Sequence, residues 1–182
     1  MICSTFLEEI ESRLADLVNR ARSHQVSLSN AQLNWSPGKD LWSIGQIYEH
    51  MRLANVKYLP LMEEGVGAAR YGRETDQVRH SLVGKMIAKA AGPGTNVPAH
   101  PAMIPSAGPF DQKVIESFIR EHEALMALAK RALGSDLRHG VRNPYMKLIS
   151  MNLADCFAIV TAHGERHIGQ IEQIMRRPDF PR

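Results

Sequence analysis

Three histidines are the residues of this chain best suited to carry out chemistry. His163 and His167 are four positions apart, and His50 lies in the first half of the sequence. Side chains four residues apart on a helix project from the same face, so two imidazoles at this spacing can bind one metal ion. A third imidazole from another helix would complete three protein ligands and leave coordination positions open. Because structural zinc sites are usually closed by four protein ligands, an open site indicates catalysis or ligand capture.

The residues around the histidine pair exclude a thermolysin-type protease. That motif requires a glutamate directly after the first histidine to act as the general base. Gly164 occupies this position. Glu165 would lie about 200° around the helix from His163, so we expect it to face solvent.

Two further side chains are candidates for the same site. His122 falls on the apolar face of a predicted helix, where it is a fourth ligand, a partner of a ligand, or a hydrogen-bonded core histidine. Gln170 shares the face of His167 and is placed to orient that imidazole. Cys156 lies two turns before His163, about 10 Å along the axis, and is expected to be a buried thiol rather than a ligand. The other histidines are expected at the surface: His24, His80, His100 and His139.

The apolar periodicity of the sequence predicts four long helices that must position these histidines. The first covers about residues 5–25. The second begins at Ser43, where Gln46 completes a capping box, and Pro60 should kink this helix or split off its last turn. His50 is then about two turns into the second helix, on its inward face.

The last two helices lie in the second half of the chain. The third follows Asp111 and stops at Gly134, and the fourth starts at Ser150 or Asn152 and ends before Pro178. An imidazole on the core face of a helix costs free energy unless it is hydrogen-bonded or bound to a metal. The fourth helix carries its histidines within such an apolar stripe: Leu153, Cys156, Val160, His163, His167, Ile171 and Ile174.

A proline-rich segment separates the second and third helices. Residues 92–109 contain five prolines, and a short helix near residues 77–91 precedes them. A long segment of this kind is expected to cross the surface and pack over one end of the bundle. Because no stretch alternates at a period of two, the sequence predicts an all-α fold. We expect an antiparallel four-helix bundle with a long crossover between helices two and three, forming a single domain over residues 1–182.

Composition narrows the class of protein further. Of 182 residues 44% are hydrophobic and 23% charged, and no run of about eighteen apolar residues occurs, so we expect a soluble protein without a membrane span. With only Cys3 and Cys156, and without the pattern of a signal peptide, we expect a cytoplasmic protein free of disulfides. The net charge is +3, and the basic segment 66–92 has the composition of a solvated face, so nucleic acid is not expected as a partner.

These features in this order resemble the DinB-like (YfiT-like) superfamily, particularly its DinB_2 branch. The resemblance covers nearly the whole chain and rests on the following residues: Trp42-Ser43-Ile44 leading into His50, the proline-rich crossover, and the run from Asn143-Pro144 to His163, His167 and Gln170. It implies an antiparallel four-helix bundle and a homodimer. It also implies a divalent metal ion, nickel or zinc, held by His50, His163 and His167.

For the function, the resemblance implies a metal ion that activates a low-molecular-weight thiol for transfer or isomerisation, while other members are called hydrolases. Three neutral imidazoles leave the double charge of the ion uncompensated, which favours a bound thiolate or hydroxide. Two classes of function stay open: an enzyme acting on a small-molecule substrate by thiol transfer or hydrolysis, and a non-catalytic module of a stress response that binds a metal or small ligand. Basic residues between Arg70 and Lys89 would hold the carboxylates of a thiol if that segment borders the site.

Overall fold

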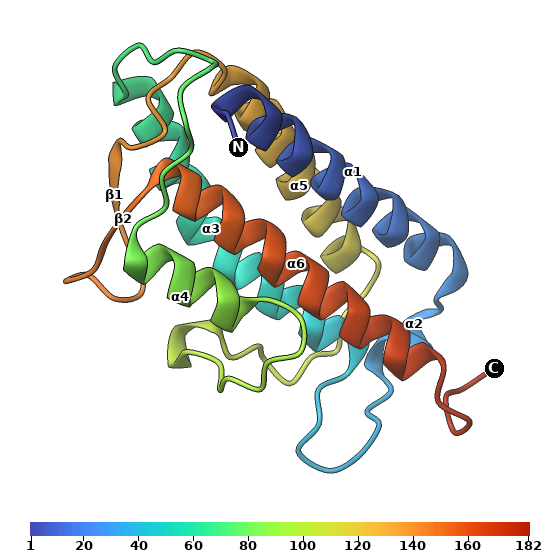
Figure 1. Ribbon diagram of the computed structural model, residues 1–182. Helices are drawn as coiled ribbons and strands as arrows, with labels where there is room; N and C mark the ends of the chain where they lie inside the picture. Colours follow the sequence, from blue (N-terminus) through green and yellow to red (C-terminus); the bar gives the residue numbers. More distant parts are fainter.

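The computed structural model describes residues 1–182 and is mostly helical, with one small two-stranded sheet (Figure 1). The four long helices are α1 (Cys3–Ser27), α3 (Ile44–Ala68), α5 (Lys113–Arg131) and α6 (Leu153–Met175). The shorter elements are the helices α2 (Asn30–Asn34) and α4 (Leu82–Ala91), the 3-10 turn η1 (Pro101–Met103), and the strands β1 (Gly140–Arg142) and β2 (Ser150–Asn152). None of the helices combines the length and the apolar character that crossing a membrane requires.

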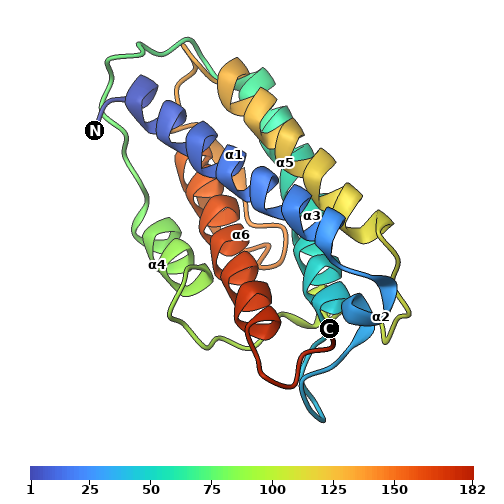
Figure 2. The same ribbon diagram turned by 90° about the vertical axis from the view of Figure 1, so that its right-hand side faces the viewer.

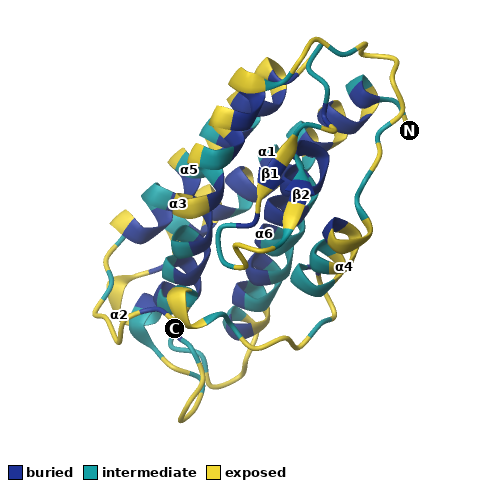
Figure 3. Ribbon diagram, turned by 90° about the vertical axis from the view of Figure 1, so that its left-hand side faces the viewer, coloured by how far each residue is buried: buried dark blue, intermediate teal, exposed yellow.

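The four long helices pack along one another. Helix α1 lies against α5 and α6, and α3 lies against the same two helices (Figures 1 and 2). Their buried sides face inward (Figure 3) and supply most of one cluster of 37 apolar residues. Burying one large apolar side chain contributes about 1.5–3 kcal/mol, so a core of this size holds the helices in place although both cysteines are free.

The predicted start of α3 is confirmed, and its predicted interruption is wrong. Ser43 Oγ accepts a hydrogen bond from the Gln46 amide, and Gln46 Oε1 accepts one from the Ser43 amide. The helix continues through Pro60 to Ala68. Pro60 removes the hydrogen bond that the carbonyl of Val56 would accept, but both residues are exposed, so water can replace the missing donor.

The boundaries of the other helices agree with the sequence to within a few residues. Helix α6 begins after Asn152, whose side chain accepts a hydrogen bond from the Asp155 amide. Helix α5 begins at Lys113 with Gln112 rather than Asp111 as its N-cap, and Gly134 follows its end with a φ of +77°. Helix α4 is shorter than predicted, since it begins at Leu82.

The mostly helical fold agrees with the predicted class, and the structure adds a small two-stranded sheet and a short helix that the sequence did not predict. Strands β1 and β2 pair in antiparallel register, with Val141 opposite Met151, and both side chains are buried. Three residues per strand are too few to give a recognisable period-two pattern. Helix α2 was also not predicted, although Ser29 and Gln32 form a capping box at its start.

A buried carboxylate joins the first turns of α4 and α6. Asp155 is 0% exposed and accepts hydrogen bonds from Ser81, the N-cap of α4, through both its hydroxyl and its amide. It also accepts from His80 Nδ1 and from the Asn152 amide. Burial raises the pKa of Asp155, but these hydrogen bonds outweigh it and leave the pKa below its ordinary value. His80 is therefore not the ordinary surface residue that the sequence predicted.

Candidate metal centre

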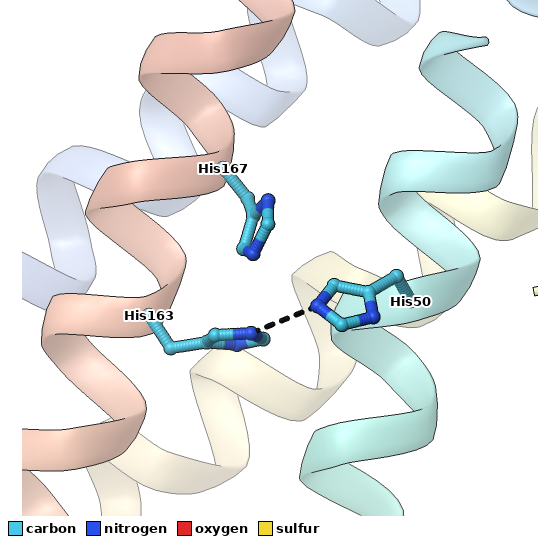
Figure 4. Close-up of side chains that lie close together, drawn as sticks. All are labelled: His50, His163 and His167. Atoms are coloured by element: carbon cyan, nitrogen blue, oxygen red, sulfur yellow. Dashed lines mark hydrogen bonds between the residues drawn. The ribbon is translucent and has the colours of Figure 1, made fainter. Parts of the chain in front are cut away.

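The structure brings His50 on α3 together with His163 and His167 on α6 (Figure 4). His50 Nε2 lies 3.1 Å from His163 Nε2, and one ring nitrogen of each histidine lies within 4.8 Å of the other two. Tetrahedral coordination with bonds of 2.0–2.1 Å separates ligand nitrogens by about 3.3 Å. Small side-chain rotations would therefore place all three imidazoles around one ion.

Hydrogen bonds orient two of the three rings. His50 Nδ1 is 2.7 Å from the carbonyl oxygen of Met103, and His167 Nδ1 is 3.0 Å from Gln170 Oε1. Since both oxygens accept, both Nδ1 atoms carry the proton, and each Nε2 keeps a free lone pair. The crossover segment thus supplies the partner of one histidine, and α6 itself supplies the partner of another. Gln170 lies where the sequence suggested an orienting role.

The three Nε2 atoms of the cluster have more lone pairs than there are N–H protons to bind them. His167 Nε2 is buried and has no hydrogen-bond partner, which costs about 1–3 kcal/mol for a neutral polar group. The short contact between His50 and His163 requires either a proton on His163 Nε2 or a cation between the two nitrogens. A divalent ion would satisfy both positions, so this set of neutral nitrogen donors fits a divalent metal ion.

Burial keeps the three imidazoles neutral. It lowers the pKa of His50 and takes that of His163 well below its ordinary value. It lowers the pKa of His167 to about 3. The nearby histidines and the charge of Arg166 lower the pKa of His163 and His167 further. At neutral pH the cluster therefore offers lone pairs to a metal rather than competing protons.

A cavity of about 500 Å³ opens beside the histidines. Its walls are formed mainly by α3, α4, α6, the crossover segment and the loop between β1 and β2, and 13 of the 23 lining residues are hydrophobic. The indole ring of Trp42 lies over His50, with ring centroids 4.9 Å apart. This volume suits a small organic molecule, and the mainly apolar wall suits one with an apolar body.

A family model described as the DinB superfamily matches residues 13–171. The chain belongs to the DinB superfamily. This confirms the resemblance seen in the sequence. No curated protein and no solved structure gives a match.

Two of the other histidines of this DinB-superfamily protein, His24 and His100, differ from their predicted positions, and His122 agrees with one of its predicted alternatives. His24 is buried, with Nδ1 2.8 Å from the hydroxyl of Tyr48. His100 lines the cavity and lies beside Tyr145. His122 is buried outside the cluster, where Nδ1 donates to the carbonyl of Phe118 and burial lowers its pKa to about 4. His122 is therefore a hydrogen-bonded core histidine rather than a fourth ligand of the cluster.

Of the remaining predictions about the site, the one for Cys156 is confirmed and the one for the basic segment is wrong. Cys156 is a fully buried thiol, as predicted, and burial raises its pKa to about 12. The basic segment does not border the cavity through its charges, because Ile87 is its one lining side chain between positions 70 and 89. Sequence reasoning missed Arg166, which lines the cavity. Its spacing of three from His163 was the available signal, since residues three apart share a helix face.

Proposed function

We propose that this DinB-superfamily protein is a metal-dependent enzyme that holds a nickel or zinc ion on His50, His163 and His167. The observation that carries the proposal is the buried Nε2 of His167, which has no protein partner and lies within reach of two further imidazole nitrogens. We take the four long helices and residues 92–109 to be the antiparallel bundle and the crossover of this family.

The proposed reaction is the transfer of a low-molecular-weight thiol to a small electrophile. The ion would supply positive charge that lowers the pKa of a bound thiol. Met103 and Gln170 would hold the ligand rings in position, and Trp42 and the apolar wall would exclude water. The cavity wall contains no aspartate or glutamate. This favours thiolate attack, because a thiolate that is already formed needs no general base from the protein.

Two alternative functions predict different experimental results. Hydrolysis of a small ester or amide would use hydroxide on the same ion. A non-catalytic module of a stress response would bind a metal or a small ligand and turn nothing over; the absence of a carboxylate base is compatible with it. A panel of physiological thiols with a generic electrophile, and a panel of esters, separates the three readings. Metal binding without turnover in either panel would leave the binding module.

Metal analysis is the first test of the proposal. Protein purified without a histidine tag should contain about one ion per chain, as expected for a single three-histidine site. His163→Ala should lose the ion. His100→Ala is the matched control, because His100 lines the same cavity but lies outside the cluster, and it should retain the ion. Protein that stays metal-free after incubation with zinc and with nickel would refute the proposed function.

A further inference from the structure

Arg166 is the one permanently charged side chain in the wall of the cavity. The 23 lining residues include no aspartate, glutamate or lysine. The other polar groups of the wall are imidazoles, amides and tyrosine hydroxyls. Arg166 is half-buried, and a guanidinium that is partly withdrawn from water in a mainly apolar wall is stabilised by a counter-charge.

The position of Arg166 places this charge beside the histidine cluster. It follows His163 by three residues on α6, so these two side chains are neighbours on one face of the helix, and both line the cavity together with His167. The guanidinium and a metal ion on the cluster would therefore border the same part of the cavity.

No carboxylate of the protein neutralises Arg166. Its neighbour Glu165 is bound instead to Arg13 of α1 through two hydrogen bonds of 2.7 Å. The only hydrogen bond of the Arg166 side chain runs from Nη2 to the carbonyl of Val97 and is 3.5 Å long. A guanidinium has five N–H donors, so most of its hydrogen-bonding capacity remains available. Arginines of the neighbouring helices differ in this respect, since Arg20 and Arg52 are both paired with glutamates.

We propose that Arg166 binds the anionic group of a small substrate whose remaining body is apolar. The ligand class is an organic carboxylate, sulfonate or phosphate, with its apolar part against the wall and its reacting end at the histidine cluster. Arginine suits this task, because its planar donors bind such anions through two hydrogen bonds at once. The assignment of the reacting end rests on the proposed function, whereas the anion subsite itself does not require the metal.

Two dyes with the same aromatic frame test the proposal. Anilinonaphthalene sulfonate carries one anionic group, N-phenylnaphthylamine is neutral, and both fluoresce when they enter an apolar cavity. Arg166→Gln should weaken binding of the sulfonate about tenfold or more, as loss of a charge-assisted hydrogen bond does, and leave the neutral dye unchanged. Arg166→Lys, which keeps the charge, should recover part of the affinity. Arg176→Gln removes a positive charge from an exposed position at the end of the same helix and should bind both dyes as the parent protein does.

The titrations are run on the protein as purified and after treatment with EDTA, with circular dichroism to verify the fold of each variant. An affinity for the sulfonate that is unchanged in Arg166→Gln overturns the proposal. An equal loss for both dyes overturns it as well, because it shows that Arg166 only shapes the cavity. If the metal analysis fails but the sulfonate still depends on Arg166, the proposed function falls and the anion subsite stands. If metal binds but the dependence is absent, the subsite falls alone.

Discussion

The carboxyl group of Glu121 should destabilise the protein as the pH rises. Glu121 lies on α5, where Oε2 accepts a hydrogen bond of 3.2 Å from Asn55, a buried residue of α3 that lines the cavity. Burial raises the pKa of Glu121 from 4.5 to about 7, against the opposing effects of Asn55 and Arg52. Because Arg52 is already paired with Glu49, it does not fully compensate a charge on Glu121.

The sign follows from the raised pKa. The folded state favours the protonated carboxyl, so the stabilising contribution is complete below pH 4.5 and is lost as the pH rises through about 7. A shift of this size corresponds to about 3 kcal/mol once the group is fully ionised. Glu121→Gln cannot ionise and keeps an oxygen for Asn55. Its advantage in free energy of unfolding should be about 2–3 kcal/mol larger near pH 8 than near pH 5.

Urea denaturation followed by circular dichroism across this pH range measures the difference directly. Glu123→Gln is the matched control, because Glu123 is exposed on the same helix and its pair with Arg22 is also exposed. An exposed pair contributes little, so the control should follow the parent protein at every pH. If the curves of Glu121→Gln and the parent protein run parallel from pH 5 to about pH 8, the reasoning about burial is wrong.

Two further predictions concern α6. A Cβ on Gly164 would lie 2.7 Å from Leu17 Cδ1, so Gly164→Ala should lower the free energy of unfolding by about 1–3 kcal/mol. Gly169→Ala, which has open space around it, should raise it by up to about 1 kcal/mol; thermal unfolding measures both, and equal effects would contradict the packing at Gly164. Gln170→Ala should weaken metal binding about 10–100-fold through the loss of the hydrogen bond to His167, as measured by competition with a coloured chelator. Gln173→Ala, at an exposed position of the same helix, should leave the affinity unchanged, and a similar loss in both variants would remove Gln170 from the site.

Local patterns predicted the helices well, because their signals lie within a few residues. The capping box of Ser43 and Gln46 and the apolar stripe of α6 are examples. The partners of His24 and His80 lie far away in the sequence. His80 bonds Asp155, 75 residues later, and no local pattern links them. The two short strands escaped for the same reason, since their pairing is visible only when the chain is folded.

The three clustered histidines of the candidate site were predictable from the sequence, whereas the residues around them were not. The spacing of His163 and His167 fixes their common face before any folding is known. The density of positive charge in the sequence drew attention to residues 66–92, but charge density says nothing about which side chains line a cavity. Arg166 stands alone among uncharged neighbours of the wall, and only the packing of α4 and the crossover against α6 makes it prominent.

The carboxylate of Asp155 holds α4 in place, so residues 92–109 do not have to position α4 in addition to lining the cavity. Because it ties the start of α4 to the start of α6, the position of the α4 wall does not depend on the length of residues 92–109. Any replacement of that stretch would have to keep a backbone carbonyl that accepts a hydrogen bond from His50. Residues 92–109 are therefore the part of the cavity wall to vary when selectivity for a new ligand is engineered, because the three histidines lie on α3 and α6.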